Sequence, residues 1–141
     1  MLKLLRIFVV TSLVALMGVA VPVSAGSIKI GFNVPLTGFA AADGKSALIG
    51  AELAVEQVNA AGGINGDSLE LVVYDDQASP KESAPLAAKL IFKDQVVAGI
   101  SGSYSGATRA AATIYQENST PYISAYAVHP DITRSGDYVF R

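Results

Sequence analysis

The chain has 141 residues, of which 51% are hydrophobic and 16% are charged, and its formal net charge is −2. It contains no cysteine and one histidine, so a disulfide framework is excluded and a zinc centre would lack its usual ligands. The mild acidity argues against binding to nucleic acid or to an anionic membrane surface, because both require an excess of basic side chains.

The first 25 residues have the three parts of a secretory signal peptide. Lys3 and Arg6 form a basic start, an apolar run follows, and Val23–Ala25 supplies small residues for cleavage before Gly26. The apolar run is shorter than the ~20 residues that a membrane-spanning helix needs. We therefore predict a signal peptide over residues 1–25 and an exported, periplasmic mature chain that is not inserted in a membrane.

The residues after this leader alternate between strand and helix patterns, at a length suited to one compact domain. Residues 28–34 predict a strand. Apolar residues at helical spacing from Lys45 to Ala60 predict a helix, which Gly62-Gly63 ends. Residues 68–74 predict a second strand, which ends on Asp75-Asp76.

The same alternation continues to the end of the chain. Pro80 begins a second helix, because proline is well tolerated in a first helical turn. A short buried strand at 96–100, an alanine-rich helix at 105–117, and strands at 121–124 and from Tyr138 follow. Strands that alternate with helices are typical of right-handed βαβ units. We therefore predict an α/β fold with three layers, in which helices cover both faces of a parallel sheet.

The segment from Ser101 to Thr108 is the most informative motif. A Ser/Gly loop that opens a helix presents free backbone N–H groups, small hydroxyls and the positive end of the helix dipole. It is a candidate receptor for a small anion such as a carboxylate; the alternative is an ordinary serine N-cap. Parallel sheets bind ligands beyond the carboxyl ends of their strands, so the loops at 35–44, 101–105 and 125–130 should converge on one rim.

Four segments resemble the periplasmic branched-chain amino-acid-binding proteins of ABC importers: Pro35–Gly38, Asn59–Gly66, Leu71–Asp76 and Ser105–Thr108. The resemblance implies the N-terminal lobe of a type I periplasmic-binding fold. In that family two lobes close around a small solute and deliver it to a membrane permease. We interpret residues 26–141 as the N-terminal ligand-binding lobe of a truncated chain, from which the second lobe is absent.

The resemblance also implies which residues contact the solute. Ser105 would bind the carboxylate through its hydroxyl and a backbone N–H, and Tyr126 and Val128 would supply contacts from a second loop. Tyr104 and Thr108 belong to the Ser105 motif and complete the predicted ligand-binding set. No cofactor and no metal ion are expected.

Two residues depart from the family pattern at the ligand end. Val128 stands where the amino-acid binders usually have threonine, and Asp43 stands where an aromatic residue is common, with Phe39 close by. These differences leave an aromatic acid or an amide open as the solute, besides a branched-chain amino acid. Tyr104 and Tyr126 could supply packing surfaces for it or could be ordinary, partly buried aromatic residues.

Enzymatic alternatives find little support in the sequence. Tyr104, not serine, stands at the centre of the only segment that resembles a nucleophile elbow, and we interpret His129 as a loop residue. Asp75 and Asp76 are adjacent on a strand and point to opposite faces, so we predict that they cap the following turn. We conclude that the chain is a binding protein and not an enzyme. A ligand-binding sensor module of the same fold is the alternative.

Overall fold

The computed structural model describes residues 26–141, so the predicted signal peptide lies outside the described residues. All strands pair in parallel in the order β2-β1-β3-β4-β5. The strands are β1 (Ser27–Val34), β2 (Ser68–Asp75), β3 (Ala98–Ser101), β4 (Tyr122–Ser124) and β5 (Val139–Phe140). The helices are α2 (Ala41–Ala60), α3 (Pro80–Phe92) and α4 (Ser105–Glu117), with 3-10 turns η1 (Gly38–Ala40) and η2 (Pro130–Ser135).

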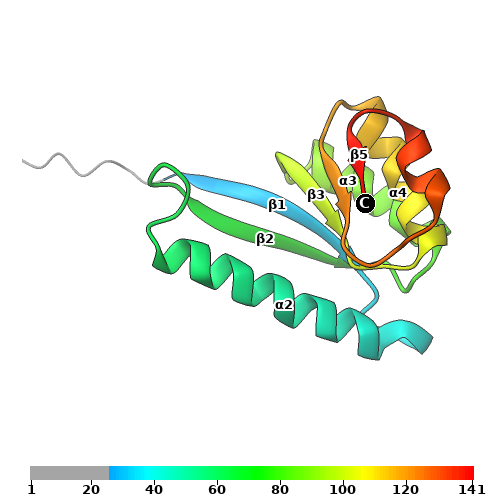
Figure 1. Cartoon of the computed structure of the whole chain (residues 1–141), viewed down its shortest axis with the longest axis horizontal. Helices are drawn as coiled ribbons and strands as arrows, with labels where there is room; N and C mark the ends of the chain where they lie inside the picture. Colours follow the sequence, from blue (N-terminus) through cyan, green and yellow to red (C-terminus); the bar gives the residue numbers. More distant parts are fainter. Residues whose placement is uncertain (1–25) are drawn as a thin grey trace, which may run out of the picture.

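The strand order explains why helices cover both faces. The connection from β1 to β2 runs one way across the sheet, whereas those from β2 to β3 and from β3 to β4 run the other way. Because such crossovers are right-handed, α2 must lie on one face and α3 and α4 on the other. Figure 1 shows α2 alongside β1 and β2, with α3 and α4 on the far side of the sheet. The predicted three-layer α/β fold is confirmed.

The main core lies between the sheet and helices α3 and α4. Tyr115 of α4 and Tyr122 of β4 are fully buried, and their rings stack with centroids 4.3 Å apart. Gly99 of β3 makes room for this pair, since a Cβ atom there would lie 2.3 Å from the Tyr115 ring. The small residues Ala107, Ala111 and Ala112 of α4 are also fully buried, so this helix packs close to its neighbours.

Two elements begin more than one residue away from their predicted starts. Helix α2 begins at Ala41 and not at Lys45, because η1 leads directly into it and Gly44 lies inside the helix. A Cβ atom at Gly44 would lie 1.7 Å from the Pro35 carbonyl oxygen, so this glycine permits a close approach and does not mark a loop. Strand β3 begins at Ala98, the first residue of that segment to pair with β1. Val96 is buried in the core just before the strand.

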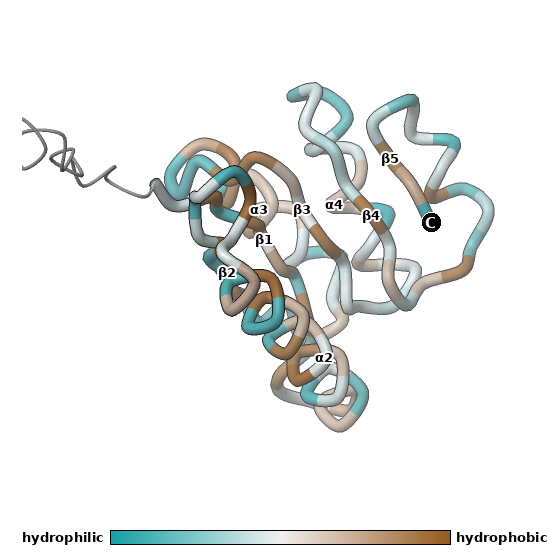
Figure 2. The backbone as a smooth tube through the Cα atoms, turned by 60° about the vertical axis from the view of Figure 1, so that its left-hand side comes forward, coloured by the Kyte–Doolittle hydropathy of each residue, from teal (hydrophilic) through white to brown (hydrophobic). Residues whose placement is uncertain are grey.

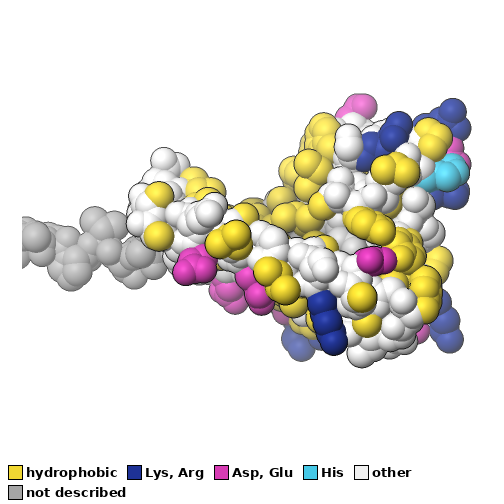
Figure 3. All heavy atoms as spheres, turned by 60° about the horizontal axis from the view of Figure 1, so that its bottom comes forward, with side chains coloured by type: hydrophobic (Ala, Val, Ile, Leu, Met, Phe, Trp, Pro, Cys, Tyr) yellow, Lys and Arg dark blue, Asp and Glu magenta, His cyan; other side chains and the backbone are white. Residues whose placement is uncertain are grey.

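An apolar row crosses the sheet on the side of α2. Phe32, Ile100, Ile123 and Phe140 are paired in register on four neighbouring strands and therefore share one face. Their exposed fractions are 1% at Phe32, 49% at Ile123 and 52% at Phe140. Helix α2 thus covers only one end of the row. Figure 2 shows hydrophobic segments along these strands, and Figure 3 shows hydrophobic side chains spread over this side of the molecule.

Within residues 26–141, none of the helices has both the length and the apolar character that a transmembrane helix needs.

Candidate functional site

Three loops meet where the strand order reverses. The first crossover leaves β1 toward β2, and the later strands lie on its other side, so β1 and β3 flank the switch point at which such sheets bind ligands. Asn33 pairs with Ser101, and Ser101 pairs with Ser124, so the carboxyl ends of β1, β3 and β4 are adjacent. The predicted convergence of the three following loops on one rim is confirmed.

Four side chains from these loops and from the start of α2 form a cluster, which we call the rim cluster: Phe39, Asp43, Tyr104 and Tyr126. The Tyr104 hydroxyl donates to Asp43 Oδ2 at 2.5 Å, across 61 residues of sequence. The Tyr104 ring stacks on Tyr126 at a centroid distance of 5.4 Å and lies tilted against Phe39 at 5.6 Å. The hydrogen bond to Asp43 is the main cause that raises the pKa of Tyr104 to about 12. Tyr104 therefore stays protonated at physiological pH.

The N-terminus of α4 opens beside this cluster. The helix begins at Ser105, and its N-cap residue is Tyr104, whose extended backbone is followed directly by the first turn. No side chain in residues 26–141 makes the N-cap hydrogen bond. The serine N-cap considered as an alternative is therefore absent. Ser105 is half-buried and Gly106 is exposed, so the first-turn N–H groups can receive an anion.

A buried polar network lies directly beneath this loop. The Thr108 hydroxyl lies 2.7 Å from Ser101 Oγ and donates to the carbonyl oxygens of Ser103 and Tyr104. Thr108 is fully buried. The prediction that Thr108 contacts the solute does not fit this position, because its hydroxyl is turned inward and holds the loop that presents Tyr104 and Ser105.

Asp76 extends the network to β2 and α3. Its carboxylate accepts hydrogen bonds from the hydroxyls of Ser83 and Ser103 and from the backbone N–H of Ala78. Ser103 precedes Tyr104, so Asp76 helps to position the loop without reaching the rim. Sequence reasoning identified Ser103 only as part of a motif. Its role depends on a contact 27 residues away that no local pattern indicates.

Asp75 faces the other way and holds the first loop. It accepts hydrogen bonds from the Leu36 N–H at 2.8 Å and from the Thr37 hydroxyl at 2.5 Å. Asp75 also accepts a hydrogen bond from the backbone N–H of Gln77, and Asp76 accepts one from the backbone N–H of Ala78. The predicted capping of the turn after β2 is confirmed.

The neighbouring carboxyls have opposite pKa shifts. Burial raises the pKa of Asp76 above its ordinary value, although its three hydrogen bonds act in the opposite direction. Burial also tends to raise the pKa of Asp75, but hydrogen bonds from the Thr37 hydroxyl and from backbone N–H groups outweigh it and lower the pKa. These shifts predict opposite effects of pH on stability.

We expect the stability difference between wild type and Asp76→Asn to fall as the pH rises. With its pKa raised on folding, Asp76 contributes fully below its unfolded pKa of about 3.9, and that contribution is lost as the pH rises through the folded value. Asp75→Asn is the matched control. Because folding lowers the pKa of Asp75, its contribution is present above the unfolded pKa and is lost at lower pH. Urea unfolding between about pH 3 and pH 8 measures both; parallel pH profiles for the two variants would contradict this assignment.

The third loop exposes the remaining predicted residues. Tyr126 is 47% exposed and Val128 is 77% exposed. The Ser124 hydroxyl donates to the Ala127 carbonyl oxygen and fixes the turn, while Arg141 Nη1 donates to the Val128 carbonyl oxygen. The structure thus brings Tyr126 into contact with Tyr104, whereas Val128 lies farther along the loop with its side chain in solvent.

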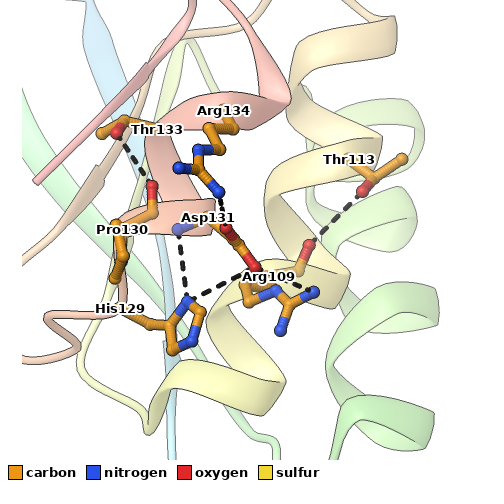
Figure 4. A network of polar contacts seen from close by, with 7 residues as sticks. All are labelled: Arg109, Thr113, His129, Pro130, Asp131, Thr133 and Arg134. Atoms are coloured by element: carbon orange, nitrogen blue, oxygen red, sulfur yellow. Dashed lines mark hydrogen bonds and ion pairs between the residues drawn. The ribbon is translucent and has the colours of Figure 1, made fainter.

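His129 belongs to a separate polar network, shown in Figure 4. Its Nδ1 accepts from the backbone N–H of Asp131 at 3.2 Å and thereby caps η2. Asp131 also pairs with Arg134 at 2.6 Å and with Arg109 at 3.7 Å. The interpretation of His129 as a loop residue is confirmed.

Comparison with known proteins identifies the family. The sequence profile described as "Periplasmic binding protein" matches residues 27–141. The chain belongs to the periplasmic binding protein family. This confirms the resemblance drawn from the sequence motifs, and it confirms a binding protein rather than an enzyme.

Individual relatives of this periplasmic binding protein have names that describe what they bind. The leucine-, isoleucine-, valine-, threonine- and alanine-binding protein of Pseudomonas aeruginosa is 38% identical over 113 residues, which cover 80% of this chain and 30% of that protein. The leucine-specific-binding protein of Salmonella typhimurium is 34% identical over 128 residues, or 87% and 34% of the two chains.

Solved structures agree with these relatives. A branched-chain amino acid transporter substrate-binding protein from Streptococcus pneumoniae, in complex with isoleucine, superposes with a TM-score of 0.77 and 38% identity, covering 81% of this chain and 33% of that one. A solute-binding protein of an ABC transporter from Rhodopseudomonas palustris, in complex with 3,4-dihydroxybenzoic acid, superposes with a TM-score of 0.74 and 28% identity, covering 81% and 32%. The chain spans about a third of the length of the relatives it matches.

Proposed function

We propose that this periplasmic binding protein binds a small carboxylate-bearing solute at the N-terminus of α4 and delivers it to the permease of an ABC importer. The observation that carries the proposal is the position of Ser105, whose helix lacks a side-chain cap at the point where three loops meet. Relatives whose names include leucine, isoleucine and valine support an amino acid as the solute.

The role assigned to each residue follows from its place. Ser105 would donate its hydroxyl and a first-turn N–H to the carboxylate, and both bonds would be strengthened by the charge of the ligand. Tyr104 and Tyr126 would supply aromatic walls. The Val128 side chain would contribute apolar contact only, because it has no donor or acceptor.

The direct test is a binding screen by isothermal titration calorimetry. The protein is expressed from its complete natural gene and titrated with leucine, isoleucine, valine and benzoate derivatives. Saturable binding of at least one carboxylate, and none of its methyl ester, is the expected result. Equal binding of acid and ester would show that the carboxylate is not the recognised group.

A receptor for an aromatic acid is the second candidate. The rim cluster favours it, since stacked phenol rings offer flat surfaces to an aromatic ligand. The Rhodopseudomonas palustris neighbour was crystallised with such an acid. In the same screen, tighter binding of benzoate derivatives than of aliphatic amino acids would favour this candidate.

We also propose that residues 1–25 direct export and are removed. The mature protein should then begin at Gly26. N-terminal sequencing and intact-mass measurement of the protein from the exported fraction of its source cells will show this start. An intact Met1 in that fraction would contradict cleavage.

A further inference from the structure

The rim cluster offers hydrogen-bond acceptors to a solute in addition to its aromatic surface. An ionised Asp43 carboxylate can only accept hydrogen bonds. The single phenolic proton of Tyr104 is already donated to Asp43, so the Tyr104 oxygen can also only accept from a ligand. At this point of the rim, Tyr104 and Asp43 together favour a group that donates hydrogen bonds.

The aromatic rings of the cluster add a preference for positive charge. Tyr104 is placed between Tyr126 and Phe39, at centroid distances of 5.4 and 5.6 Å. Phe39 is 82% exposed, and Tyr126 is also accessible at the loop surface. Aromatic faces attract ammonium and guanidinium groups through the electrostatic quadrupole of the ring.

A cavity of about 530 Å³ adjoins the cluster and connects it to α2. Asp43, Ser46 and Ala47 of α2 line it, together with Ala125 and Tyr126 of the third loop. Its size suits a small organic molecule. Asp43 is the charged residue of a lining that is otherwise neutral and mostly apolar. A solute without a hydrogen-bond donor would displace water from the Asp43 carboxylate and offer no hydrogen bond in its place, which costs free energy.

Tyr104 links this acidic surface to the anion site. Tyr104 directly precedes Ser105, and its hydroxyl donates to Asp43. Its side chain therefore spans the distance from the anion site to the Asp43 carboxylate. We propose that Asp43, held by Tyr104, selects solutes that carry a hydrogen-bond donor, and best an ammonium group, at the end remote from the carboxylate. This inference rests on the proposed function, in which Ser105 binds that carboxylate.

Lysine and norleucine provide the sharpest test, since they share one carbon chain and differ by the terminal ammonium group. Ornithine and norvaline form a second matched pair with a chain one carbon shorter. With the protein expressed from its complete natural gene, calorimetry should show at least about tenfold tighter binding of the ammonium-bearing member of one pair. Asp43→Asn should remove most of that preference, chiefly by weakening the binding of the ammonium-bearing member.

Tyr104→Phe is the companion variant, because it keeps the charge of Asp43 and removes the hydrogen bond that holds it. It should reduce the preference less than Asp43→Asn does. Asp43 is exposed, and circular dichroism together with Tm will verify that both variants fold. If both members of each pair bind equally, or if Asp43→Asn leaves their ratio unchanged, the role of Asp43 is overturned. If none of these four amino acids binds while another carboxylate of the screen does, this inference alone is overturned. If no carboxylate of the screen binds, the proposed function itself fails, and this inference fails with it.

Discussion

Replacement of Ser105 by alanine should weaken binding of the carboxylate solute by about 1–3 kcal/mol, which is roughly 5- to 150-fold in Kd. The loss has two parts. The variant lacks the hydroxyl that donates to a charged group, and the solute carboxylate is left with one fewer donor after it has lost its water. The helix itself should be little affected, because Tyr104 and not Ser105 occupies the N-cap position.

Isothermal titration calorimetry with the tightest solute of the screen measures this effect. Ser27→Ala is the matched control, since Ser27 begins β1 at the opposite end of the sheet and its hydroxyl donates to Glu70 on the surface. The control should bind as the wild type does. An unchanged Kd for Ser105→Ala, with the solute still bound, would remove Ser105 from the site.

Replacement of Gly44 by alanine should lower the free energy of unfolding by about 3 kcal/mol and Tm by roughly 10 °C. The added Cβ would stand 1.7 Å from the Pro35 carbonyl oxygen, a backbone atom that cannot turn aside as a flexible side chain could. Helix α2 must therefore move away from the end of β1. Because Asp43 is the preceding residue, the same movement should disturb its hydrogen bond to Tyr104.

Gly50→Ala is the control for this prediction, within the same helix. Nothing lies within 4 Å of the position that its Cβ would occupy. Alanine there should stabilise the protein by up to about 1 kcal/mol, because it has the higher helix propensity. Urea unfolding of the two variants should therefore give changes of opposite sign. Equal changes would mean that propensity, and not the contact with Pro35, determines the result.

The order and type of the elements could be predicted because each carries a local pattern. Apolar periodicity identified the strands and helices, and their alternation indicated a parallel sheet whose loops meet at one rim. The start of α2 could not be predicted, because Asp43-Gly44 has the composition of a turn. Only the approach of Pro35 explains a glycine inside that helix.

The site was predicted less completely than the fold. Ser105 and Tyr126 were predicted through family motifs and lie at the rim, whereas Thr108 shares the Ser105 motif and is buried beneath the loop. The contact between Asp43 and Tyr104 joins residues 61 positions apart. A single sequence contains no pattern that pairs such distant residues, so Asp43 could be noticed only as a departure from the family.

The position of β1 between β2 and β3 has a consequence for the growing polypeptide. Of the strands in residues 26–141, β1 is made first, and β2 can pair with one of its edges before β3 is made. Strands β3, β4 and β5 are added afterwards at the opposite edge, in the order in which they leave the ribosome. Each new strand therefore finds its partner already formed, and no earlier strand has to be displaced. Assembly can follow translation step by step, in line with the N-terminal-first folding of nascent domains.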